Sequence, residues 1–320
     1  MSRHADRCSH HHITDAPTRS DPTGTGHIVR AFDRDLVRRF QGIRRLVWQA
    51  VAVNDVFGTG SDQDADAMIR SAAVALAVAR ITGDEAPQPG AFELTTSAGK
   101  VEAFMRWLRQ EQARGVLEVV EGAPQSTAAA TAWTNVYVRR AYERGVEHSA
   151  EQITRAGGTV SRRWIDAAFN RPIHADRAGL AFTRTYDQLR GITEAMDQQI
   201  SRTLAEALAT GQGPRATARR LVERVDNLAI VRARVLARTE TIAAHAEASL
   251  NTYEEAGIEG VDVMAEWSTA GDNAVCEFCA TMADRGPYTL SAAHGLIPAH
   301  PNCRCVFIPR IRDAGRITLQ

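Results

Sequence analysis

Apolar residues recur every three or four positions along most of this chain, which is the spacing of amphipathic α-helices. The first such stripe begins near Ala31 and predicts a helix whose other faces carry arginines. The same spacing predicts further helices over residues 62–82, 98–113 and 126–155. The residues that define the first stripe are Phe32, Leu36, Phe40, Ile43, Val47 and Val51.

The longest stripe starts at Ala175 and repeats at spacings of three and four, so one face of a long helix is apolar. Gly211 is expected to end this helix, and Pro214 to open a short helix over residues 214–225. Asp226 is then predicted to cap a final long helix, which ends at Gly257. The apolar positions of the first long helix are Phe182, Tyr186, Leu189, Ile192, Met196, Ile200, Leu204 and Leu208.

The pattern changes from helical to alternating after Gly257. The segment "VDVMAEWSTA" alternates apolar and polar residues and predicts a strand, and "CVFIPRI" predicts a second, short strand. The sequence therefore predicts a mainly α protein, a body of long helices followed by a small C-terminal α+β subdomain stapled by zinc. The expected organisation is a disordered tail (1–28), an N-terminal helical region (29–165), a long-helix region (170–256) and a small strand-containing subdomain (257–312).

The distribution of cysteines along the chain suggests a zinc site. The chain has five cysteines, of which four lie between residues 276 and 305 and the fifth, Cys8, lies in the polar tail. This tail has no apolar stretch typical of an export signal. Such clustering favours a metal site in a reducing compartment over a disulfide framework. Two disulfides and free buried thiols remain the alternatives.

The spacing of these residues suits a tetrahedral metal site. Cys276 and Cys279 form a short chelate, and the second half, "HPNCRC", adds His300, Cys303 and Cys305. Zinc takes four such ligands, and five are offered. Cys305 or His300 is the fourth beside Cys276, Cys279 and Cys303; a strand would turn residues 303 and 305 to the same side, which slightly favours Cys305. A site closed by four ligands is structural.

His294 is a weaker candidate ligand from outside this set, and a surface position fits it better. Glu277, between the first two cysteines, is expected to be an exposed turn residue.

Composition excludes some functions. No apolar run approaches the ~18 residues of a membrane span, so no membrane association is expected. The formal net charge is zero, which argues against a wholly basic nucleic-acid coat, although the basic residues are arginines apart from Lys100. The chain has no GxxxxGK[ST] or GxGxxG motif and no nucleophile elbow, so no small-molecule substrate is expected.

The segment "ARTET" on the final long helix holds a second group of polar residues. Arg238 and Glu240 are two positions apart and lie ~200° apart around a helix, so they cannot share one site. Arg238 is expected to tie the helix to the terminal subdomain, with Asp272 as one candidate partner. Glu240 is better explained by structural pairing than by a role as catalytic base.

Taken in order, these residues resemble the phage Mu protein F-like family of minor head proteins, also called phage head morphogenesis proteins. The resemblance covers roughly residues 175–310, and residues 170–256 would be the long-helix part of its domain. It implies a non-catalytic virion protein, present in few copies inside the capsid near the portal and in the host cytoplasm during assembly. The matching motifs are Arg238, Thr239 and Glu240 in "ARTET", then Trp267, then "DNAVCEFC" from Asp272, and "HPNCRC" from His300.

The same resemblance implies partners: the portal protein, other head proteins, and double-stranded DNA as a further candidate. Two alternatives stay open. A metal-dependent nuclease with a treble-clef-like site would use His300 and Asn302, although the usual Asp-His or His-His core is absent from the sequence. A plain DNA-binding zinc protein is the other.

Overall fold

The computed structural model describes residues 21–60, 86–118, 132–168, 171–258, 263–311 and 318–319. The helix predicted over residues 62–82 and the tail residue Cys8 lie outside these ranges. The Cα positions divide the chain into two compact units. Unit 1 comprises Met1–Asp33, Gly122–Tyr186 and Val235–Gln320, and unit 2 comprises Arg34–Glu121 and Asp187–Arg234.

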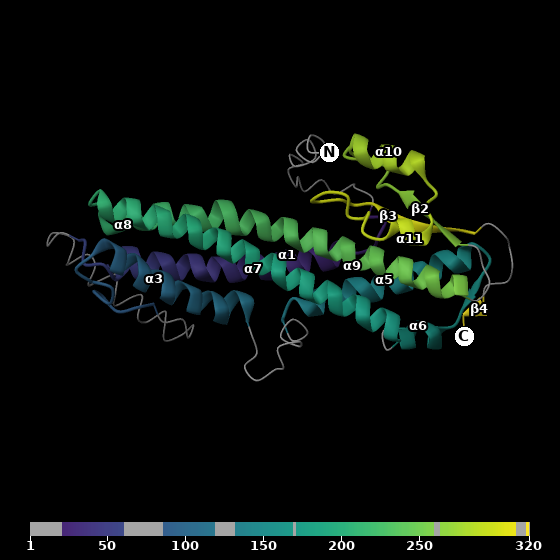
Figure 1. Cartoon of the computed structure of the whole chain (residues 1–320), viewed down its shortest axis with the longest axis horizontal. Coiled ribbons are helices and arrows are strands. Elements are labelled where there is room, and N and C mark those ends of the chain that lie inside the picture. The colour runs from purple at the N-terminus through teal and green to yellow at the C-terminus, as the bar shows by residue number, and fades with distance from the viewer. Residues whose placement is uncertain are drawn as a thin grey trace. The chain divides into compact units, whose positions relative to one another are not determined.

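Unit 1 contains the beginning of one helix, the first part of a second, most of a third and the whole C-terminal region (Figure 1). Its helices are α1 (Gly26–Trp48, in part), α5 (Asn135–Arg155), α6 (Arg162–Ala168), α7 (Pro172–Ala209, in part), α9 (Val231–Ile258, in part), α10 (Glu277–Arg285) and α11 (Leu290–Ala293). Its strands are β1 (Thr159–Val160), β2 (Val263–Ser268), β3 (Val306–Ile311) and β4 (Thr318–Leu319).

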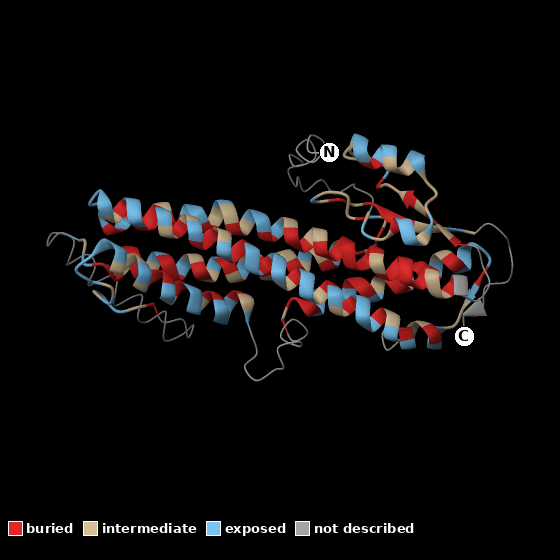
Figure 2. Cartoon of the chain, viewed as in Figure 1, coloured by how far each residue is buried: buried red, intermediate tan, exposed pale blue. Residues whose placement is uncertain are grey.

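The core of unit 1 joins helices and strands. Strand β2 pairs antiparallel with β3, in a register that sets Trp267 opposite Phe307. The two rings pack edge to face with centroids 5.8 Å apart, and both residues are buried. Tyr253 of α9 donates a hydrogen bond to the Phe307 carbonyl at 3.1 Å, so the strand pair is fastened to the helix below it. Figure 2 shows buried residues along α5 and α9 beside these strands.

The predicted fold class is confirmed: long helices dominate, and a small antiparallel strand pair follows near the C-terminus. The two predicted strands coincide with β2 and β3. The short parallel pair of β1 with β4 was not predicted, because a two-residue strand has no readable alternation. Among the described residues, no helix is apolar enough over a sufficient length to cross a membrane.

Unit 2 consists of helices joined by turns and loops, which occupy residues 54–60, 86–96 and 210–213 among its described residues. Arg109 and Gln112 of α3 hold Asp197 of α7 through hydrogen bonds of 3.0 and 2.6 Å. Phe57, outside these helices, and Phe104 on α3 belong to an aromatic cluster with centroids 5.5 Å apart. The elements are the rest of α1 and α7, the π-helix η1 (Gln49–Val53), α3 (Ser97–Gln112), η3 (Ala113–Leu117), α8 (Pro214–Arg224), η4 (Val225–Ile230) and the first residues of α9.

The structure corrects the prediction of two separate helices after Pro214. Residues 214–258 are helical without interruption, because the π-helix η4 joins α8 to α9. Asp226 caps nothing: it lies inside η4 and pairs with Arg44 at 2.9 Å. No Gly or Pro stands between Pro214 and Gly257 to stop the helix, and buried Val225 and Ala229 continue its apolar face.

The first helix begins earlier than its apolar stripe suggested. Helix α1 starts at Gly26, and the preceding Asp21 carboxylate accepts a hydrogen bond from the Gly26 amide at 2.6 Å. Thr23 and Thr25 are buried and bond to each other at 2.6 Å. The polar composition of this stretch suggested a disordered tail, yet the Asp21 side chain satisfies one of the free amides at the helix start. Residues 21–28, assigned to the tail, are therefore part of unit 1.

Candidate metal centre

The first half of the site is a turn followed by a helix start. The amide of Val275 donates to the carbonyl of Asp272 at 3.1 Å, which closes a turn just before Cys276. Cys276 is the N-cap of α10, and its Sγ accepts the Cys279 amide at 3.4 Å. The Cys-x-x-Cys spacing thus places both sulfurs at one helix N-terminus, where backbone N–H groups favour the thiolate form.

The second half is a tight turn over "HPNC". The Cys303 amide donates to the His300 carbonyl at 3.1 Å, with Pro301 and Asn302 between them. Asn302 has φ of 64°, the left-handed conformation that Asn tolerates better than most residues. Pro followed by a residue with positive φ is the pattern of a type II turn, and it brings His300 and Cys303 together.

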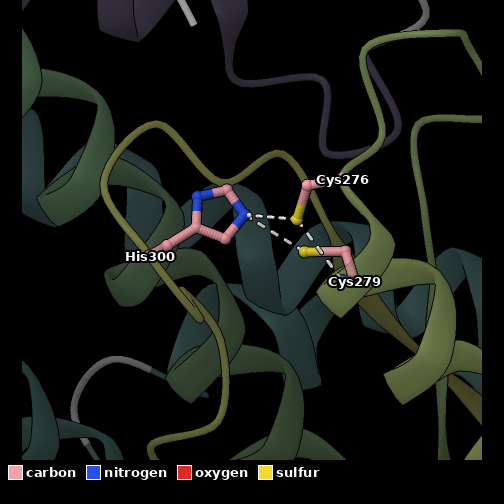
Figure 3. A group of neighbouring side chains, drawn as sticks. All are labelled: Cys276, Cys279 and His300. Carbon is pink, nitrogen blue, oxygen red and sulfur yellow. Dashed lines mark hydrogen bonds between the residues drawn. The ribbon is translucent and has the colours of Figure 1, made fainter. Parts of the chain in front are cut away.

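The donor atoms of both halves converge. Cys276, Cys279 and His300 form one group, and Cys279, Cys303 and Cys305 form another; in each, the ligand atoms lie within 4.8 Å of one another. The His300 Nε2 is 3.4 Å from the Cys276 sulfur and 3.2 Å from the Cys279 sulfur (Figure 3). A tetrahedral zinc ion with bonds of ~2.3 Å to sulfur and ~2.0 Å to nitrogen separates these atoms by about 3.5 Å.

The His300 ring is oriented as a ligand. Its Nδ1 lies 2.8 Å from the Pro301 carbonyl oxygen, which can only accept, so Nδ1 carries the proton. In the neutral ring, Nε2 is then left with a lone pair that faces the two thiols. Metal-binding histidines are typically held this way, by a hydrogen bond from the nitrogen that does not bind the ion.

The electrostatics of the cysteines fit a bound cation. All four are free thiols, and Cys279, Cys303 and Cys305 are buried. Hydrogen bonds from Cys279 and Cys305 lower the pKa of Cys303 to about 2. Cys303 and Cys305 in turn raise the pKa of Cys279. One buried thiolate thus suppresses ionisation of its neighbour, whereas a cation would stabilise several thiolates together.

Trp267 adds a second observation in favour of a metal. Its buried indole Nε1 has no hydrogen-bond partner among the described residues. The indole lies beside Cys305: Cys279 and the Trp267 N–H act to lower the pKa of that thiol, but Cys303 and burial outweigh them and raise the pKa to about 12. A Cys305 thiolate, stabilised by a cation held by the neighbouring donors, would give this buried N–H an acceptor. Sulfur and imidazole donors are the set that zinc prefers, so these residues could hold it.

An ion pair fastens the two halves together around the donors. Arg304, between Cys303 and Cys305, donates to both carboxylate oxygens of Asp272 at 2.6 Å. The hydrogen bonds with Asp272 raise the pKa of Arg304. Arg304 was not singled out from the sequence; the signal was its place between two ligand candidates. The pairing of Arg238 with Asp272 remains a prediction.

The "ARTET" residues occupy a different part of unit 1. Glu240 is buried, and its Oε2 accepts from Arg184 Nε at 2.8 Å and from Thr185 Oγ1 at 3.2 Å. These bonds join α9 to α7. The geometry therefore brings together the five donors with Asp272 and Trp267, and it gives Glu240 a structural ion pair of its own.

The surroundings of His294 differ from those that the sequence predicted. It is neither one of the grouped donors nor a simple surface residue: it lies between Glu247 and Glu254 of α9. The seven-residue spacing of the two glutamates, two turns on one helix face, was the only available signal.

Comparison with known proteins adds one match. Residues 198–308 match the family model described as Phage Mu protein F like protein. This segment contains all five candidate donors, Asp272, Trp267 and the "ARTET" motif. No curated protein and no solved structure matches the chain significantly.

Proposed function

Because residues 198–308 match the family model described as Phage Mu protein F like protein, we propose that this chain is a structural, non-catalytic protein of phage head morphogenesis. The family match carries the head role, and the observation that supports a structural, non-catalytic part is the pair of overlapping donor groups that share Cys279, one with Cys276 and His300 and the other with Cys303 and Cys305. Four of these five donors would complete a tetrahedron around zinc and leave no open position for substrate or water. A site of this kind stabilises a small subdomain and does not perform chemistry.

The zinc would be held by residues of both halves of the site. Cys276, Cys279 and His300 face one another, and Cys303 is linked to His300 by the 300–303 turn. We assign the fourth position to Cys303 and regard Cys305 as the spare donor. When bound, the ion supplies cross-links between α10 and the segment before β3. The chain's own residues orient the donors, through Pro301 at His300 and Asp272 at Arg304.

The nuclease alternative is disfavoured by the same geometry. His300 would have to act as a general base, yet Nδ1 bonds to Pro301 and Nε2 faces two sulfurs. Glu240, the other candidate base, is engaged by Arg184 and Thr185. A base without a free nitrogen or oxygen near substrate cannot accept a proton from water.

Contact with packaged DNA is a finer part of the proposal, supported by the helix over residues 214–234. This stretch has six arginines against two acidic residues. Arg215, Arg219 and Arg232 are exposed, and no ion pair engages them among the residues that the structure describes. Exposed guanidinium groups suit phosphate, and binding through them would weaken steeply with salt. Proximity to the portal, and location in the virion after assembly in the host cytoplasm, rest on the family alone.

Co-expression tests the proposed role. The chain would be produced together with the portal, scaffold and major capsid proteins of the same phage, and the particles would be purified. We expect it to co-purify with procapsids in few copies. Particles that form normally and never contain the chain would contradict a head protein, and DNA cleavage with added magnesium that is lost in His300→Ala would support the nuclease.

A further inference from the structure

His294 is held between two acidic residues of one helix. Its Nδ1 lies 2.9 Å from Glu247 Oε2, and its Nε2 lies 2.9 Å from Glu254 Oε1. Glu247 uses its other oxygen to accept the Gly295 amide at 3.3 Å. Two consecutive residues of the terminal region are therefore bound to α9.

The two partners define the charge of the ring. A carboxylate oxygen accepts hydrogen bonds and does not donate them, so each ring nitrogen must carry a proton. His294 is thus an imidazolium between two carboxylates. Burial lowers the pKa of His294, but the bonds with Glu254 and Glu247 outweigh it and raise that pKa above the ordinary value. Among the described residues, these two glutamates are the charged groups that act on it.

His294 lies where its contact with α9 can hold the surrounding segment, residues 289–297, against that helix. It directly follows α11, whose Ala293 is buried, and it precedes the buried Ile297. The chain then continues to the turn that presents His300. Its side chain is only 20% exposed, and those of Glu247 and Glu254 are 17% and 29% exposed, so solvent screens the three charges only partly.

We infer that His294, Glu247 and Glu254 form a pH-sensitive latch that fastens residues 289–297 to α9 and opens at alkaline pH. A group whose pKa is raised by folding stabilises the folded form fully below its unfolded pKa of ~6.5. That stabilisation falls as pH rises through the raised pKa, because a neutral ring can donate to only one of the two glutamates. The latch is independent of the proposed head function and of the metal donors.

Hydrogen exchange on the full-length, metal-loaded protein tests the latch. Protection factors, which correct for the intrinsic pH dependence of exchange, are measured for residues 289–297 between pH 6 and pH 9.5. We expect protection to fall with rising pH, by up to tenfold for each unit by which the pKa of His294 exceeds the reference value. In His294→Gln, which cannot titrate, protection at pH 6 should be lower and independent of pH. His27→Gln, at an exposed position of α1, is the matched control and should behave as wild type.

A second measurement covers the case in which His294→Gln fails to fold. Titration of the wild-type His294 ring by NMR should give a midpoint above ~6.5, and Glu254→Gln should lower that midpoint. A His294 midpoint at or below the reference value, or protection of residues 289–297 that does not change with pH, would overturn the proposal.

Discussion

Arg304 donates two hydrogen bonds of 2.6 Å to the carboxylate of Asp272, and this ion pair connects the two halves of the candidate metal site. Asp272 stands four residues before Cys276, and Arg304 stands between Cys303 and Cys305. The two side chains are 19% and 18% exposed, so the pair is largely shielded from water. This geometry gives Asp272 and Arg304 a structural role: their ion pair positions the backbone segments that carry the donor side chains.

Asp272→Asn is expected to weaken metal binding without removing a donor. The amide cannot accept two charge-assisted bonds from Arg304, so the halves of the site are held less firmly. Partners of this kind typically change metal affinity by roughly 10–100-fold. Competition with a chromogenic chelator measures the change. Asp187→Asn, which removes an exposed ion pair with Arg190 in unit 2, is the control and should leave affinity unaltered.

Single serine substitutions separate the required donors from the spare one. Cys276→Ser, Cys279→Ser and Cys303→Ser should each lose most of the bound zinc, because a hydroxyl is a poor replacement for a thiolate. Cys305→Ser should retain close to one ion per chain, as should Cys8→Ser. Metal analysis of the purified variants measures this, and retention of zinc in Cys303→Ser together with loss in Cys305→Ser would reverse the assignment.

Glu240→Gln tests the structural role of the "ARTET" helix. The carboxylate is buried against Arg184 and Thr185, and its neutral replacement should reduce the free energy of unfolding by about 1–3 kcal/mol. Zinc content should not change. Urea denaturation provides the measurement, with Glu194→Gln, at an exposed position of α7, as the control. An unchanged midpoint would show that the Arg184 pair contributes nothing.

Acid should destabilise unit 1 through His245. Burial is the main cause that lowers the pKa of His245 to about 3, and His148, whose own pKa is lowered by burial, adds to it. In the unfolded chain the His245 ring therefore binds a proton near pH 6.5, whereas in the folded chain it stays neutral at that pH. Stability is full above that pH and falls as the pH drops toward 3, by about 2–3 kcal/mol at pH 4.5.

Comparison of urea denaturation at pH 7 and pH 4.5 checks this dependence. His245→Gln should show a smaller loss between the two values, whereas His27→Gln should keep the full loss. An acid dependence that is identical in wild type and His245→Gln would assign the effect to other groups.

Much of the fold could be read from periodicity. The stripe from Phe182 to Leu208 predicts α7, and Gly211, with φ of 64°, ends it as expected. The predicted helix over residues 98–113 corresponds to α3. The prediction at Asp226 was wrong, because a residue suited to N-capping starts a new helix only where the apolar face of the preceding helix breaks. Here Val225 and Ala229 carry that face across.

The site could be predicted as a set of donors but not as a geometry. Cysteine spacing marks Cys276, Cys279 and Cys303 as candidate donors without knowledge of the fold. By contrast, the contacts of Arg304 and His294 depend on tertiary structure: Asp272 is 32 residues from Arg304, and Glu247 is 47 residues from His294. With separations this large, neither pairing can be identified from the local sequence pattern.

Removal of the metal tests the central claim most directly. Zinc is quantified in the purified chain, and hydrogen exchange is followed with and without a strong chelator. The account predicts one zinc ion per chain, whose loss sharply reduces protection over residues 263–311 while α5 and α9 stay largely protected. A chain that is purified without metal, or one whose residues 263–311 keep their protection after the ion is removed, would contradict a structural zinc site.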